Sequence, residues 1–230
     1  PKMSDPITQI PKPRIDSYAD KRKLFLVPVY MAPKENAEEG QQILTEYWIE
    51  VSEQINSFEQ KLGKINNIFH EGVSEGDQKE LEMLKQMNEK GSPFIQSLLK
   101  NDAKLIPTEK KELLEETIDW QRCLSVGLVN SKVYSEIMSK FQTSITERYS
   151  FISKQIDQHL KIDNPGILLI NEEHKVQFSD DIQVFYVSPP ALDEYRRWLQ
   201  SWLTSNQNQD SEDAEIENSD QVKSKNGADT

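Results

Sequence analysis

Apolar residues along this chain form two kinds of pattern, which alternate. Short continuous runs predict strands, because a strand that is buried on both faces of a parallel sheet is apolar at nearly every position. The run that begins at Gly166 is the densest, so we expect it to form the central strand, and Pro28 predicts a bend or an edge position in the first run. The four runs are Lys23–Met31, Lys64–Phe69, Gly166–Ile170 and Ile182–Val187.

Apolar residues spaced three and four apart predict helices between these runs. The first helix opens at Asn36, which with Glu39 forms a capping-box pattern, and extends to Leu62. The most regular stripe runs for about eight turns from Ser131 to Leu160. The other predicted helices cover 74–90, 92–100 and 107–124, with no strand among them, and a last helix begins at Pro189 and Pro190.

The order of these segments predicts an α/β fold with a small, mostly parallel sheet, flanked by long helices and carrying a helical insertion. The first two strands are joined by a helix, which favours their parallel pairing. Residues 1–20 contain Pro6, Pro11 and Pro13 without an apolar period, and are interpreted as an extended or disordered arm. Residues 21–203 are expected to form a single α/β domain, and 204–230 a disordered acidic tail.

Charge and composition narrow the class of protein. A formal net charge of −12 over 230 residues argues against binding to nucleic acid or to an anionic membrane. No apolar run reaches the ~18 residues of a membrane span. The single cysteine, Cys123, excludes an intramolecular disulfide and fits a reducing compartment, so a cytoplasmic location is expected. Glycine-rich phosphate loops and serine-hydrolase elbows are both absent from the sequence.

Polar residues follow two of the predicted strands directly. His70 and Glu71 come after the second strand, and Glu173 and His174 after the third. Ligands of open α/β sheets bind beyond the carboxyl ends of strands, so these side chains could converge there, with Arg148 from the long helix holding an anion. We therefore predict catalytic roles for Glu71, Arg148 and His174. His70, Glu173 and His174 are predicted as ligands of a divalent metal, the candidate cofactor.

A structural interpretation stands beside this hypothesis, since strand ends are polar in most proteins. In that case His70 and His174 have no special role, and Arg148 pairs locally with Glu147 or Asp157. Cys123 is interpreted as a buried, inert thiol in a helix.

Three short motifs occur in a recognisable order: FHEG at 69–72, ERYSFI at 147–152 and GILLINEEH at 166–174. Together they resemble the TraB/Tiki-like family, to which erythromycin-esterase-like proteins are related. The resemblance implies an α/β fold with a pseudo-repeated strand arrangement. It also implies, for some members, metal-dependent hydrolysis at positions matching Glu71, Arg148 and His174. The family's first strand ends in a G-x-x-H turn, which this chain lacks, so loss of the metal chemistry is the alternative.

Two functions from different classes remain. One is a non-catalytic binding or interaction protein that engages another protein or a small molecule through the polar site or a helical face. A homodimer through the helix Ser131–Leu160 is one form of this hypothesis. The other is a metal-dependent hydrolase of the TraB/Tiki-like type. The hydrolase requires Glu71, Arg148 and His174 to converge within contact distance.

Overall fold

The computed structural model describes residues 20–31, 33 and 37–205, which divide into two compact units. The first unit comprises residues 20–31 and 51–188 and contains the sheet; the second comprises the described residues between 33 and 50 and from 189 to 205. The predicted N-terminal arm lies outside the described residues except for residue 20. The predicted acidic tail also lies outside them, except for residues 204 and 205, which are helical.

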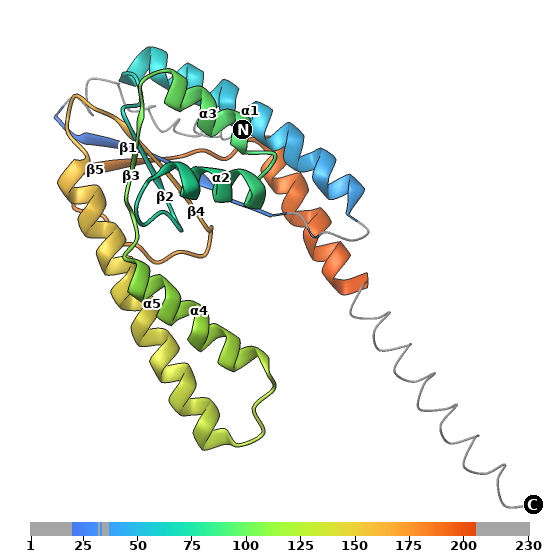
Figure 1. The fold of residues 1–230 in the computed structure, drawn as a ribbon. Helices are drawn as coiled ribbons and strands as arrows, with labels where there is room; N and C mark the ends of the chain where they lie inside the picture. Colours follow the sequence, from blue (N-terminus) through green and yellow to red (C-terminus); the bar gives the residue numbers. More distant parts are fainter. Residues whose placement is uncertain (1–19, 32, 34–36, 206–230) are drawn as a thin grey trace, which may run out of the picture. The chain divides into compact units, whose positions relative to one another are not determined.

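Five parallel strands form one sheet in the order β3-β2-β4-β1-β5 (Figure 1). This confirms the predicted α/β class with a mostly parallel sheet. The strand order places β4 in the middle, and all five of its residues are buried, as expected for the densest apolar run. The strands are β1 (Arg22–Pro28), β2 (Asn67–His70), β3 (Lys104–Ile106), β4 (Gly166–Ile170) and β5 (Ile182–Tyr186).

Two expectations about the strands are wrong, and a third is wrong in part. β1 and β2 are parallel but do not pair with each other, because β4 lies between them. The middle of the chain is not free of strands, since β3 pairs with β2; its three residues are too few to show a periodicity. Pro28 does not mark a sheet edge. It is the last residue of β1 and lies opposite Ile170, where its missing N–H is tolerated at the strand end.

The helices fall near their predicted positions. Asn130 fixes the start of α5, because its side-chain oxygen accepts hydrogen bonds from the backbone N–H groups of Lys132 and Val133. The predicted cap of α1 at Asn36 lies outside the described residues. The helices are α1 (Glu38–Leu62), α2 (Gln78–Met87), α3 (Ser92–Lys100), α4 (Lys111–Ser125), α5 (Ser131–His159) and an unlabelled helix at 190–205.

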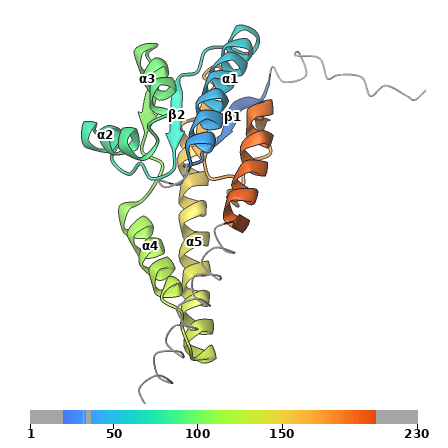
Figure 2. The same cartoon turned by 90° about the vertical axis from the view of Figure 1, so that its right-hand side faces the viewer.

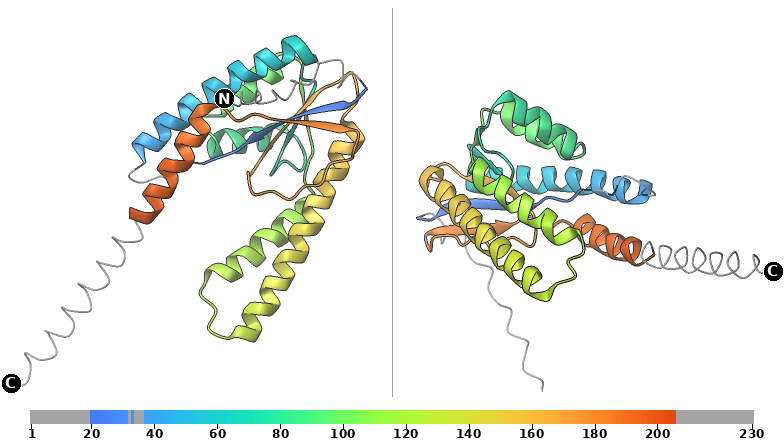
Figure 3. Two further views of the ribbon diagram at one scale, coloured as in Figure 1. Left: turned by 180° about the vertical axis from the view of Figure 1, so that it is seen from behind. Right: turned by 60° about the horizontal axis from the view of Figure 1, so that its bottom comes forward.

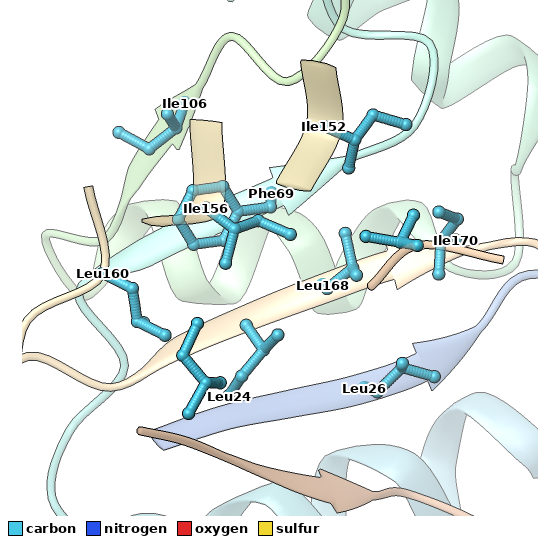
Figure 4. Close-up of a cluster of buried hydrophobic side chains, with 11 residues drawn as sticks. Leu24, Leu26, Phe69, Ile106, Ile152, Ile156, Leu160, Leu168 and Ile170 are labelled. Atoms are coloured by element: carbon cyan, nitrogen blue, oxygen red, sulfur yellow. The ribbon is translucent and has the colours of Figure 1, made fainter. Parts of the chain in front are cut away.

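Within the first unit, helices cover the two faces of the sheet. Ile152, Ile156 and Leu160 pack on one face, against a cluster that includes Leu168 and Phe69 (Figure 4). The opposite face carries Phe25, whose ring stacks on Phe58 of α1 with 5.4 Å between the ring centroids. Figure 3 shows α5 and this second half of α1 on different sides of the strands.

Close packing at the start of β4 explains why a glycine begins this strand. A Cβ atom on Gly166 would lie 2.8 Å from the Leu160 side chain and 2.9 Å from the Phe69 ring, which is closer than carbon atoms normally approach. Glycine therefore lets the end of α5 and β2 meet over the central strand.

The second unit contains the first half of α1 and the helix at 190–205. Gly40 faces Trp198, because a Cβ at this glycine would lie 2.1 Å from the indole ring. The Glu50 carboxylate accepts a hydrogen bond of 2.9 Å from the backbone N–H of Ala191, near the start of the helix at 190–205. Leu192 and Tyr195, three residues apart on one side of this helix, are both buried.

α4 and α5 form an antiparallel hairpin that extends beyond the sheet (Figures 1 and 2). The hydroxyl of Thr117 donates to that of Ser144 at 3.2 Å, and both residues are buried where the two helices meet. Gly127 has a φ of +71° in the turn between the helices, a conformation that glycine adopts without strain. We call this hairpin, from Lys111 to Glu147, the arm.

Candidate functional site

The position of Arg148 follows from the spacing of α5. Arg148, Ile152 and Ile156 are four residues apart, so they share one face of the helix. Ile152 and Ile156 pack on the sheet, and Arg148, one turn earlier, therefore meets the carboxyl ends of the strands. Its side chain is 13% exposed.

Arg148 makes its closest contacts with Glu109. The Nε atom lies 2.9 Å from each carboxylate oxygen of Glu109, and Nη2 also donates to Oε1. The Glu109 side chain is fully buried, with 0% exposure. Because Glu109 lies two residues before the start of α4, this ion pair joins the two helices at the base of the arm.

Glu71 connects the same guanidinium to two strands. Its Oε2 lies 3.3 Å from Nη2 of Arg148, and its Oε1 accepts a 2.7 Å hydrogen bond from the backbone N–H of Asn171. The backbone N–H of Gly72 donates to Glu109 at 3.2 Å. The residues Glu71, Glu109 and Arg148, which we call the clamp, thus link the ends of β2 and β4 to both helices of the arm.

Burial and charge shape the ionisation of the clamp. Burial raises the pKa of Glu71 above its ordinary value, although Arg148 and the N–H of Asn171 oppose this shift. Burial alone would lower the pKa of Arg148, but the hydrogen bonds and charge of Glu109 raise it above its ordinary value. Burial also raises the pKa of the neighbouring Tyr149. Two carboxylates and one guanidinium leave the clamp with a net negative charge when all three are ionised.

The structure brings together two of the three predicted catalytic residues, Glu71 and Arg148. His174 makes its contacts within its own loop. Its Nδ1 accepts a hydrogen bond of 3.2 Å from the backbone N–H of Val176, and its ring packs edge-on against that of Phe178, with 6.1 Å between the ring centroids. Burial lowers the pKa of His174. The local pairing of Arg148 with Asp157 is also wrong, since Asp157 pairs with Arg22 at 2.6 Å.

The predicted metal ligands do not form a site. Within 20–31, 33 and 37–205, no three His, Cys, Asp or Glu side chains are arranged to hold a metal ion. Glu173 is exposed, with its N–H bound to the side chain of Asn171 at 2.8 Å, while His70 is buried at the end of β2. The set His70, Glu173 and His174 is therefore not assembled as expected.

Sequence reasoning missed Glu109. The predicted helix began at Pro107, whereas α4 begins at Lys111 and Glu109 lies in the loop after β3. The only feature of the sequence that could have indicated Glu109 is its position after β3. This strand has three residues, which are too few to show a periodicity. The expectation of a buried Cys123 is wrong as well, because this residue is partly exposed on the arm.

His70 is a buried histidine at the end of β2, directly before Glu71 of the clamp. Its Nδ1 contacts the backbone carbonyl of Glu71, which assigns the proton to Nδ1. Its Nε2 is buried and has no hydrogen-bond partner among the described residues. Burial lowers the pKa of His70 to about 4, because a charged imidazolium would have to be desolvated there.

We expect His70 to make the protein less stable in mild acid. An unfolded histidine binds a proton near pH 6.5 and the folded one only near pH 4, so the unfolding free energy falls as the pH drops through this window. The full loss is about 3 kcal/mol. Urea unfolding at several pH values measures the unfolding free energies of wild type and of His70→Leu. The difference between the two proteins isolates His70, because both share the carboxylate titrations, including that of Glu71, and these largely cancel. If the difference in unfolding free energy between the two proteins stayed constant from pH 7 to pH 4, the lowered pKa of His70 would be contradicted.

The fold and the clamp define an α/β protein with a parallel five-stranded sheet and a projecting helical arm. The chain matches no protein-family model, and neither the curated proteins nor the solved structures contain a significant match to it. The TraB/Tiki-like relationship therefore stays a prediction. Among the residues that the structure describes, no helix combines the length and apolar character that crossing a membrane demands.

Proposed function

We propose that this protein acts by binding rather than catalysis, with the arm as its binding surface and the clamp as the device that orients the arm on the sheet. The observation that carries the proposal is the position of the clamp. Arg148 belongs to one helix of the arm and Glu109 precedes the other, while Glu71 belongs to the sheet. A clamp at this point holds the base of the arm in a defined direction.

The bonding of the clamp supports a structural role for these polar groups. Arg148 donates to both carboxylates, and each carboxylate also accepts a backbone N–H. A buried ion network rarely adds more stability than apolar residues of the same size, so its best-attested use is to specify one arrangement. In this protein that arrangement is the attachment of the arm.

The surface of the arm supports a role in binding. Every large apolar or aromatic side chain of the arm is at least partly exposed, because two helices alone cannot enclose a core. These side chains are Leu113, Leu114, Ile118, Trp120, Leu124, Val126, Leu128, Val129, Val133, Tyr134, Ile137, Met138, Phe141 and Ile145.

One observation favours the alternative, a metal-dependent hydrolase. Glu71 is 22% exposed, lies beyond the carboxyl end of a parallel strand and has a raised pKa, which are properties of a catalytic carboxylate. Tyr149 lies close enough for both Glu71 and Glu173 to influence its pKa. On this alternative, Glu71 with a residue from the loop after β4 would activate a water molecule.

A thermal-shift experiment with metals tests the choice between the two functions. We expect the melting temperature in Zn²⁺ or Mn²⁺ to agree with that in EDTA within about 1 °C, because a ligand stabilises a protein only if it binds the folded state. A rise of more than about 3 °C that is lost in Glu71→Gln would contradict the proposal and favour the hydrolase. Glu89→Gln, which changes an exposed carboxylate away from the clamp, controls for metal binding to the surface.

A further inference from the structure

The first half of α5 carries a row of exposed residues outside its contact with α4. Its members recur at alternating spacings of three and four, which places them along one line of the helix. We call this row the α5 seam; it consists of Val133, Glu136, Lys140, Thr143 and Glu147, all exposed. A row with this spacing runs along one side of the helix, so a second helix can lie beside it and meet its charged and apolar side chains in turn.

The charges of the α5 seam are complementary to those of a second, antiparallel copy. We consider a two-fold axis level with Met138. Each residue before position 138 then lies opposite the residue of the second copy that is equally far after it. Glu136 then faces Lys140 of the second copy, and the symmetry repeats this attractive contact. A parallel pair in register would instead set Glu136 against Glu136, so the charges select the antiparallel arrangement.

The shape of the α5 seam agrees with the same axis. A shallow hollow of about 390 Å³ lies on α5, lined by Ser139, Gln142, Thr143, Thr146 and Glu147. The axis at Met138 sets Thr143 of this hollow opposite Val133 of the second copy. Val133 is 45% exposed and apolar, so its entry into the hollow removes apolar surface from water, as a knob fills a hole between paired helices.

We propose that the partner of the arm is a second copy of this chain, bound through the α5 seam as an antiparallel helix pair. This inference rests on the proposed function in taking the arm as the binding surface, and it names the partner. The contact extends from Ser131 to Ile145, about 22 Å of helix at 1.5 Å per residue. A contact this short gives a weak dimer, with a dissociation constant in the micromolar range or above.

Sedimentation equilibrium of the full chain over a range of concentrations tests the inference. We expect wild type to shift from monomer to dimer as the concentration rises. Glu136→Lys and Lys140→Glu should each weaken the dimer at least about tenfold, because either change turns two symmetric attractions into repulsions. The double variant Glu136→Lys with Lys140→Glu restores opposite charges and should return the dissociation constant to within about threefold of wild type. Val133→Asp should also weaken the dimer, because it places a charge in the hollow.

The controls separate the dimer from folding and from the proposed function. Glu89→Lys makes the same charge change away from the arm and should leave association unchanged. Circular dichroism of each variant should match wild type, because the altered side chains are exposed. A wild-type chain that stays monomeric, or a double variant that fails to restore the dimer, overturns the second copy as partner. The proposed function itself is tested separately. It fails if metal ions raise the melting temperature and if this rise is lost in Glu71→Gln.

Discussion

Arg148→Met is expected to reduce the unfolding free energy by about 3–5 kcal/mol, because it leaves the carboxylate of Glu109 buried without a cation. The Glu109 side chain has no exposed surface in the folded chain, so water cannot replace the guanidinium without opening the base of the arm. Methionine keeps much of the length and apolar stem of arginine, which limits the loss of packing. Urea unfolding at pH 7 measures the change.

Two further variants show whether this loss comes from the buried charge. Arg148→Met combined with Glu109→Gln should recover part of the stability, since the buried carboxylate is then gone. Arg122→Met removes an exposed ion pair with Asp119, on the arm as well, and should cost less than about 1 kcal/mol. A loss below about 1 kcal/mol in Arg148→Met would show that the clamp does not hold the arm.

Phe69→Ala is expected to have an effect of similar size, about 3–5 kcal/mol, through loss of core packing. Phe69 lies on β2, and its ring is fully buried against the start of β4 and the end of α5 (Figure 4). Removing it leaves a cavity that the rigid strands around it cannot close. The same urea unfolding experiment measures the loss.

The matched control for this core substitution is Val129→Ala, which also shortens an apolar side chain. Val129 is 100% exposed, so this change should stay within about 0.5 kcal/mol of wild type. If Phe69→Ala instead cost less than about 1.5 kcal/mol, the packing of α5 on the sheet would be in doubt.

The candidate site could be predicted only in part, and the reason is visible in its three residues. Glu71 and Arg148 were found because each follows from a strong element, a strand end and a regular helix. Glu109 was missed because it follows β3, whose three residues leave no pattern in the sequence. His174 was expected to join them, but the loop after β4 gives it partners of its own, Val176 and Phe178.

The apolar pattern of the chain was sufficient for four of the five strands, the long helices and the α/β class, because burial on a sheet or a helix face imposes a period that neighbouring residues share. The order of the strands and the composition of the clamp depended on tertiary structure. Arg148 meets Glu109 across 39 positions of sequence, and Glu71 meets Asn171 across 100. Such contacts leave no local period, since each depends on how several elements pack together. For the same reason, the structure alone revealed that Arg148, predicted as a catalytic residue, pairs with Glu109 at the base of the arm.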